Sequence, residues 1–189
     1  MTNCLQVQPG PGGKDNLIEG LKEIIRDVPD FPKKGIIFKD ITPLLGDPDM
    51  FGKVIDALAE RYAAKNIVKV VGIEARGFIF CSALAHALKA GCVMVRKPGK
   101  LPYKTHQQTY DLEYGTDTLE IHQDALSDGD NVLLIDDVLA TGGTMAATVQ
   151  LVRKNFKANI VEVAFLIELD FLKGRDKLSG IPIHSLLHY

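Results

Sequence analysis

The sequence has 189 residues, enough for one domain with a sizeable hydrophobic core. Its hydrophobic content of 46% and charged content of 24% are ordinary for a soluble globular protein, and its net charge of −2 gives no reason to expect broad binding to nucleic acid or a membrane surface. No apolar run is long enough to cross a bilayer, and no charged segment followed by an apolar one marks a secretory signal. The cysteines (Cys4, Cys81 and Cys92) have no metal-binding spacing, so we expect reduced thiols in a cytoplasmic protein.

The N-terminal part of the chain predicts a tail and then a helix. Residues 1–16 include a Pro-Gly-rich stretch and are expected to be disordered, with a single domain over residues 17–189. Apolar residues at helical spacing predict a helix over residues 17–28, which Pro29 and Pro32 end.

A loop and a second helix are expected next. Residues 29–35 predict an irregular loop, and residues 36–38 an extended triplet. Asp47 is a favoured N-cap residue, and Pro48 suits the first helical position, so the second helix is expected to begin there.

Short apolar runs then alternate with helical patterns. Strands are expected at residues 67–73, 92–96, 132–135 and 160–167, and helices at residues 77–90 and 144–156. Residues 97–108 are polar and contain two prolines, which predicts a long mobile loop, and residues 109–123 predict a hairpin. This order predicts an open, mainly parallel α/β sheet flanked by helices, with ligands bound beyond the carboxyl ends of its strands.

One of these strand ends carries the clearest chemical signal. Asp136 and Asp137 follow the expected strand at 132–135, and a small loop and a helix start come next. This phosphate loop consists of Ala140, Thr141, Gly142, Gly143 and Thr144. Glycines let backbone N–H groups turn towards an anion, threonine hydroxyls add donors, and a helix N-terminus favours negative charge. The pattern predicts a monophosphate site, beside two acids that can hold vicinal ribose hydroxyls; a turn with an aspartate cap is the alternative.

Residues 132–144 resemble the phosphoribosyl pyrophosphate (PRPP) binding motif of the type I phosphoribosyltransferases. The resemblance implies the fold of that family, with a small hood at residues 17–45 over the active site. It also implies that Asp136 and Asp137 bind the ribose and that the phosphate loop binds the 5′-phosphate. Mg²⁺ is expected to bind mainly through the substrate, with no direct protein ligand.

Four further segments resemble the adenine-specific members of this family. They are residues 31–43, 72–78, 96–102 and 110–115, and the likeness extends over residues 17–189. It implies purine salvage in a cytoplasmic homodimer: adenine and PRPP give AMP and diphosphate through an oxocarbenium-like transition state. A hypoxanthine-guanine or xanthine phosphoribosyltransferase remains an alternative, as does a non-catalytic regulator that senses PRPP or purines on the same fold.

The expected adenine-binding residues are Ile37, Phe38 and Lys39. Apolar side chains on an irregular segment can enclose a purine ring. From the residues alone an ordinary edge strand is equally consistent, so the assignment to adenine comes from the resemblance.

The pyrophosphate is expected to bind Arg76 and a basic cluster formed by Arg96, Lys97 and Lys100. Arg76 stands at a helix start, where its guanidinium suits an oxyanion, and we also expect it to act in catalysis. The resemblance implies that Arg96 reaches the partner subunit's substrate, and it suggests a strained or cis peptide bond near Glu74–Ala75. By themselves, a surface salt bridge for Arg76 and a solvated charge run for the cluster are the simpler interpretations.

Glu113 is the expected general acid/base. It ends the predicted mobile catalytic loop at residues 97–113, and the family's glutamate in this motif contacts the purine near N7. Enclosure by a closing loop would raise the pKa of this carboxyl group, which suits proton transfer near neutral pH. A surface glutamate on a strand is the alternative. Cys81 is expected only to pack inside its helix, and none of the histidines is assigned a chemical role.

Overall fold

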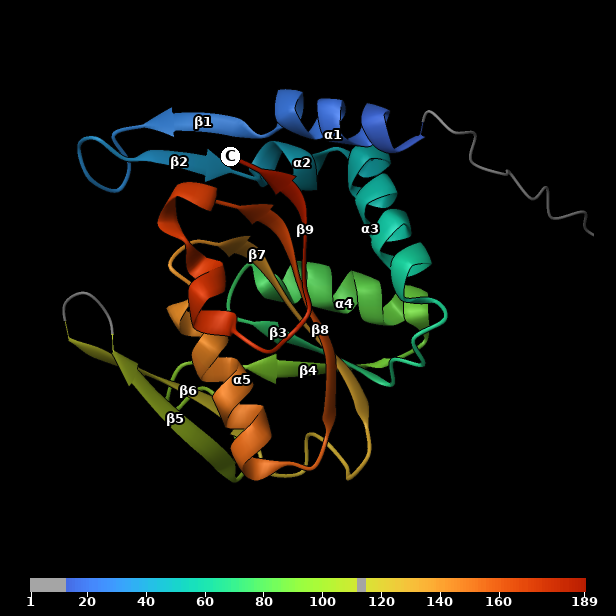
Figure 1. The fold of residues 1–189 in the computed structure, drawn as a ribbon, viewed down its shortest axis with the longest axis vertical. Coiled ribbons are helices and arrows are strands. Elements are labelled where there is room, and N and C mark those ends of the chain that lie inside the picture. Colours follow the sequence, from blue (N-terminus) through green and yellow to red (C-terminus); the bar gives the residue numbers. More distant parts are fainter. Residues whose placement is uncertain (1–12, 112–114) are drawn as a thin grey trace, which may run out of the picture. The chain divides into compact units, whose positions relative to one another are not determined.

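The structure is a computed structural model that describes residues 13–111 and 115–189. It divides into two compact units, Met1–Val54 and Ile55–Tyr189, which are described separately. Figure 1 shows the order of the elements along the chain. Among the described residues, no helix is both long and apolar enough to cross a membrane.

The N-terminal unit contains two short helices, a hairpin and the start of a longer helix. Its elements are α1 (Gly13–Ile24), β1 (Arg26–Pro29), β2 (Ile37–Asp40), α2 (Thr42–Gly46) and the first part of α3 (Pro48–Tyr62). α1 begins earlier than the expected domain start at residue 17. The predicted helix over residues 17–28 is wrong at its end, because Val28 lies in β1 opposite Phe38. A residue that precedes proline disfavours helical dihedral angles, so Pro29 holds Val28 in extended backbone.

The start of α3 confirms the predicted cap. The backbone N–H of Met50 donates to Asp47 Oδ1 at 2.8 Å, and Pro48 occupies the first helical position. The short helix α2 was not predicted from the sequence. Pro43 lies in its first turn, where backbone N–H groups have no partner within the helix, so the missing N–H of proline costs no hydrogen bond.

The C-terminal unit is built on a five-stranded parallel sheet with strand order β4-β3-β7-β8-β9. The strands are β3 (Lys69–Ile73), β4 (Gly91–Val95), β7 (Asn131–Leu139), β8 (Asn159–Glu168) and β9 (Ile183–His188). The helices are α4 (Gly77–Leu88), which follows β3, and α5 (Gly143–Asn155), which follows β7. The expected parallel α/β sheet is confirmed, and all strand pairs within it are parallel.

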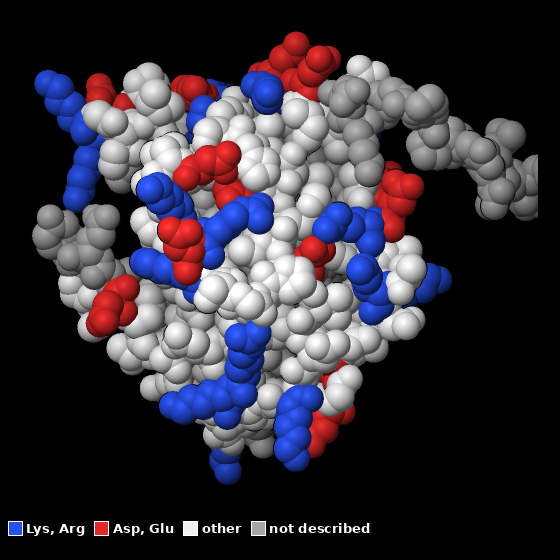
Figure 2. All heavy atoms as spheres, viewed as in Figure 1, with Lys and Arg blue, Asp and Glu red and all other residues white. Residues whose placement is uncertain are grey.

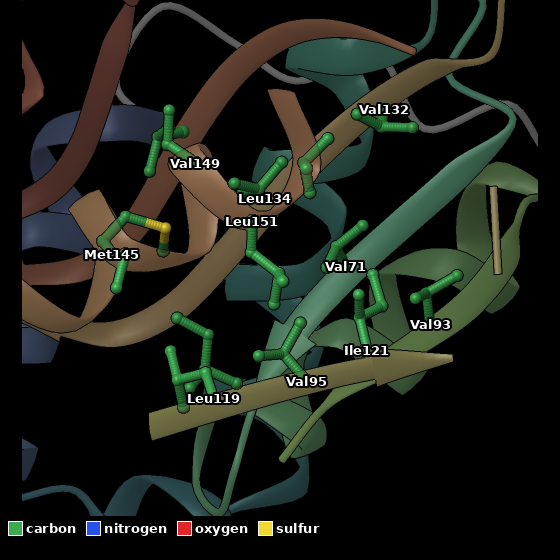
Figure 3. Packing of buried hydrophobic residues seen from close by; sticks show 14 of the residues in the cluster. Val71, Val93, Val95, Leu119, Ile121, Val132, Leu134, Met145, Val149 and Leu151 are labelled. Atoms are coloured by element: carbon green, nitrogen blue, oxygen red, sulfur yellow. The ribbon is translucent and has the colours of Figure 1, made fainter. Parts of the chain in front are cut away.

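Alternating side chains of the strands cover the two faces of this sheet. On one face Val71 lies opposite Val93 and Leu134, and these residues pack with Ile121 and with Leu151 of α5 (Figure 3). On the other face, α4 packs against β3 so closely that a Cβ on Gly72 would lie 2.5 Å from the Cβ of Cys81. Cys81 is fully buried, which agrees with its expected packing role.

A two-stranded sheet consists of β5 (Thr105–Asp111) and β6 (Thr116–His122), paired antiparallel from Thr105 opposite His122 to Asp111 opposite Thr116. The predicted hairpin is therefore confirmed, but the loop expected at 97–108 is too long, because residues 105–108 lie in β5. These residues are polar, so their sequence does not show the apolar pattern of a strand. They pair with β6, whose Leu119 and Ile121 supply the buried side chains. The 3₁₀ helices η1 (Asp170–Leu172) and η2 (Gly174–Leu178) separate β8 from β9.

Candidate functional site

The two acids of the predicted motif lie within β7 rather than after it. The strand was expected to end at Ile135, but it continues to Leu139, which pairs with Glu168 of β8. Val138 and Leu139 continue the apolar alternation, so the backbone stays extended past the acids. The N–H of Asp137 donates to Asp136 Oδ1 at 2.9 Å, which fixes the Asp136 carboxyl group against the backbone of its neighbour.

The phosphate loop forms a small hollow at the same end of the sheet. The hollow has a volume of about 90 Å³ and is lined by Asp136, residues 138–145 and Phe165. Gly142 has a φ of 76°, in the left-handed region that favours glycine, and α5 begins at the next residue. The first N–H groups of a helix have no partner within it, so this hollow is suited to an anion.

Burial and charge repulsion dominate the electrostatics of the acid pair. Burial raises the pKa of Asp136 well above its ordinary value, and the neighbouring Asp137 charge raises it further. Burial also raises the pKa of Asp137, although the Arg76 guanidinium opposes this shift. Arg76 Nε lies 2.8 Å from Asp137 Oδ2. An additional positive charge beside the pair would therefore be stabilising.

The start of α4 brings Arg76 to these acids. A Cβ on Gly77 would lie 2.7 Å from Asp136 Oδ1, so the close approach of α4 to β7 requires glycine at this position. The Glu74–Ala75 peptide bond is cis, which confirms the suggestion from the sequence. Arg76 thus lies at the expected helix start and forms an ion pair, as the alternative interpretation allowed, but its partner is the buried Asp137 of the motif.

Glu74 organises the basic cluster. Its buried carboxylate accepts hydrogen bonds from Arg96 Nε at 2.8 Å and from the Lys97 N–H at 3.0 Å, and Lys100 Nζ lies 3.7 Å away. Burial by itself raises the pKa of Glu74, but the hydrogen bonds from Arg96 and Lys97 and the nearby charges lower it below its ordinary value. The Arg96 guanidinium also lies 6.0 Å from the Phe78 ring centroid.

The remaining cation of the cluster is paired with the hairpin. Lys97 Nζ forms an ion pair with Asp117 Oδ2. The cations are thus brought together as expected, each beside a carboxylate. On the face shown in Figure 2, Lys and Arg side chains are likewise interspersed with Asp and Glu side chains.

Tyr110 of β5 contacts both parts of the site. Its hydroxyl lies 3.2 Å from Thr144 Oγ1 of the phosphate loop and donates to Asp117 Oδ2 at 3.2 Å. A Cβ on Gly143 would lie 3.8 Å from the Tyr110 ring. Sequence reasoning gave no role to Tyr110, Asp117 or Glu74, because their contacts with Thr144, Lys97 and Arg96 join residues at least 20 positions apart in the chain. The alternation of half-buried and exposed side chains along β5 was the pattern that could have placed Tyr110 on the inner face of the hairpin.

The predicted adenine-binding residues lie on β2 in the N-terminal unit. The Ile37 side chain is exposed, and the Phe31 and Phe38 rings pack edge to face with centroids 5.2 Å apart. Lys39 Nζ donates to Asp27 Oδ1 at 2.6 Å, across the β1–β2 hairpin. Glu113, the predicted acid/base, lies outside the residues that the structure describes.

Comparison with known proteins agrees with this geometry. The family model for the phosphoribosyl transferase domain matches residues 42–180. The adenine phosphoribosyltransferase of Acidobacterium capsulatum is 61% identical over 171 residues, which are 90% of this chain and 94% of that protein. The crystal structure of the Rhodothermus marinus adenine phosphoribosyltransferase has a TM-score of 0.87 at 53% identity, covering 93% of this chain and 99% of its own. The crystal structure of the Saccharomyces cerevisiae enzyme, complexed with adenine and an imino-altritol bisphosphate, has a TM-score of 0.86 at 44% identity. The match covers 91% of this chain and 99% of that chain.

A parallel sheet that carries an acid pair and a phosphate loop at one strand end defines a class of transferase. The chain belongs to the phosphoribosyltransferase family. Within that family it groups with the adenine phosphoribosyltransferases, the purine-salvage enzymes that form AMP from adenine.

Proposed function

We propose that the chain transfers the phosphoribosyl group of PRPP to adenine through an oxocarbenium-like transition state, releasing diphosphate. The observation that carries the proposal is the phosphate loop next to Asp136 and the buried Asp137. In this proposal the loop anchors the 5′-phosphate through backbone N–H groups and the Thr141 and Thr144 hydroxyls.

Asp136 and Asp137 are proposed to hold the ribose hydroxyls and to stabilise positive charge at C1′. Their raised pKa values support this role, because burial and mutual repulsion make a neighbouring positive charge favourable. The same two residues fit a site for Mg²⁺, because carboxylate oxygens are the hard donors that this ion prefers. They can contact the water molecules or the substrate atoms that bind the ion. When bound with PRPP, Mg²⁺ would neutralise charge on the pyrophosphate.

Arg76 and the basic cluster are proposed to bind the pyrophosphate as it leaves C1′. Their positions near the carboxyl ends of β3 and β4 support this role. Each cation has a carboxylate partner, so pyrophosphate binding exchanges one anionic partner for another.

The base is proposed to bind Ile37, Phe38 and Lys39, with Glu113 moving the proton at purine N7. These assignments rest on the family resemblance, as does closure of residues 97–113 to exclude water from the activated sugar. A homodimer in which Arg96 reaches the partner subunit's substrate is also proposed; the exposed apolar side chains of Ile79 and Met94 support an interface there. A cytoplasmic location is proposed from the three cysteines, whose number and spacing give no disulfide framework.

Incubation with PRPP, Mg²⁺ and one labelled base at a time tests the proposal. Adenine should give AMP rapidly, whereas hypoxanthine and guanine should react poorly, because a 6-oxo group presents the wrong hydrogen-bonding pattern. Comparable rates for the three bases would contradict the adenine site. The matched variant Glu113→Ala should depress turnover strongly and leave PRPP affinity nearly unchanged; normal turnover would remove Glu113 from the mechanism.

A further inference from the structure

A segment outside the proposed mechanism packs against the phosphate loop. It follows β8 and contains η1 and η2. Its Leu169 N–H donates to the carbonyl oxygen of Leu139 at 2.9 Å, directly before the phosphate loop. A Cβ on Gly142 would collide with the carbonyl oxygen of Gly174, and a Cβ on Gly174 would collide with that of Ala140. Backbone therefore touches backbone, and no intervening side chain can absorb a displacement of one against the other.

Glu168 anchors this segment at the end of β8. Its side chain is buried and accepts hydrogen bonds from Arg175 Nε at 2.5 Å and from Arg175 Nη2 at 2.6 Å. Ser185 Oγ donates to the same carboxylate at 2.6 Å. A bidentate guanidinium–carboxylate pair restricts distance and orientation together. Because Arg175 directly follows Gly174, this pair also restricts the position of the Gly174 backbone.

The charges around this pair keep it intact near neutral pH. Burial by itself raises the pKa of Glu168, but the hydrogen bonds from Arg175 and Ser185 and the Arg175 charge lower it below its ordinary value. The hydrogen bond to Glu168 raises the pKa of Arg175. His188 faces the same carboxylate, with Nδ1 3.8 Å from Glu168 Oε2 and 2.9 Å from Asp170 Oδ1.

We propose that Arg175 is a positioning residue for the 5′-phosphate site, because its pairing with Glu168 holds Gly174 against Gly142 and thereby sets the conformation of the phosphate loop. The inference rests on the proposed role of that loop and extends it to residues with no assigned function. Arg175 is proposed to fix the position of the loop and not to bind the phosphate itself, since the buried Glu168 carboxylate accepts hydrogen bonds from two of its nitrogen atoms.

Inhibition of AMP formation by two probes tests the inference. Ribose 5-phosphate carries the 5′-phosphate, whereas inorganic pyrophosphate occupies the other end of the PRPP site. Arg175→Met and Gly174→Ala should each weaken inhibition by ribose 5-phosphate about tenfold, the range reported for residues that act on a site indirectly. Inhibition by pyrophosphate should change less than about twofold. Arg175→Lys should give a smaller loss of the same kind, because an ammonium group cannot bridge both carboxylate oxygens.

Arg153→Met is the matched control. Arg153 lies on α5, and its Nη2 donates to the Gly180 carbonyl oxygen at 3.5 Å. This variant should leave both inhibition constants unchanged. Thermal unfolding identifies any variant that fails to fold; if Arg175→Met does not fold, Arg175→Lys is the variant that tests the role of Arg175, and Gly174→Ala tests only the contact with the loop.

Two results would overturn the role of Arg175: unchanged inhibition by ribose 5-phosphate in the folded variants, or equal loss for both probes, which indicates general destabilisation. A separate variant examines the underlying assignment. If ribose 5-phosphate inhibits Thr141→Ala/Thr144→Ala as strongly as the unmodified chain, the phosphate loop itself is misassigned, whatever the Arg175 variants show.

Discussion

The phosphate loop and the basic cluster both suit anions, but they are built in opposite ways. The loop contains no charged residue; its donors are N–H groups and hydroxyls, held by backbone contact between Gly142 and Gly174. The cluster depends on charged side chains, and its cations are held by the carboxylates of Glu74 and Asp117.

The phosphate loop is therefore a preformed anion site, whereas the cations of the basic cluster must exchange a carboxylate partner for the bound anion. Neutral backbone donors are already oriented before an anion arrives, so little reorganisation accompanies binding. A paired cation has to leave its carboxylate or share it. We therefore expect substitutions at the loop to act through geometry and substitutions at the cluster to act through charge.

The largest effect is expected from Gly142→Val. The left-handed φ and the collision with Gly174 both oppose a β-branched side chain. The resulting strain of about 1–3 kcal/mol, together with displacement of the loop, should lower kcat/KM for PRPP about 100-fold. Steady-state kinetics measure this effect. Gly129→Val, at another left-handed glycine with open space around it, is the control for backbone strain alone, and an equal loss in both variants would contradict the importance of the Gly174 contact.

The next effect is expected from Asp137→Asn. Loss of the carboxylate charge removes a hydrogen-bond acceptor for ribose and releases Arg76 from its ion pair. The affinities for PRPP and AMP should fall about tenfold, the usual loss when a charged hydrogen-bond partner is neutralised. Calorimetry checks this, with the exposed Asp124→Asn as control. Unchanged affinity would exclude Asp137 from the ribose site.

A smaller effect of the opposite sign is expected from Asp117→Asn. The amide retains the shape of the side chain but frees the Lys97 ammonium for an incoming anion. Inhibition by pyrophosphate should become about two- to fivefold stronger, in keeping with the modest energy of a partly exposed ion pair. Inhibition by ribose 5-phosphate should stay constant. Weaker inhibition by pyrophosphate would show that Asp117 supports the cluster instead of competing for it.

The smallest effect concerns stability. Because the pKa of Asp136 is raised in the folded state, its ionised form opposes folding at neutral pH. Asp136→Asn should therefore raise Tm at pH 8 by about 2–4 °C, the shift that 1 kcal/mol gives at this chain length, while activity falls. This gain should shrink as the pH falls through the raised pKa towards the ordinary 3.8, where the carboxyl group is neutral in both states. A gain that is constant with pH would contradict the electrostatic explanation.

Local and distant contacts explain which features the sequence could predict. The phosphate loop was predictable because its strand, acids, glycines and helix start are contiguous in residues 132–144. The cap at Asp47 was predictable for the same reason. The pairing of Arg96 with Glu74 was not, because it depends on the parallel register of β3 and β4. The end of α1 was misjudged because Val28 continues the apolar spacing but pairs with Phe38 in a hairpin.

The contact between Tyr110 and Thr144 has a consequence for proton positions. Each hydroxyl has one proton, and Tyr110 lies within reach of both Asp117 and Thr144. While Tyr110 donates to Asp117, its oxygen can accept the Thr144 proton. If Thr144 donates its hydrogen bond to a phosphate oxygen instead, Tyr110 has two acceptors, Asp117 and Thr144, for its one proton, so the direction of the hydrogen-bond chain can reverse. Phosphate binding at the loop, as proposed, would therefore change the hydrogen bonding of Tyr110 to Asp117, the ion-pair partner of Lys97.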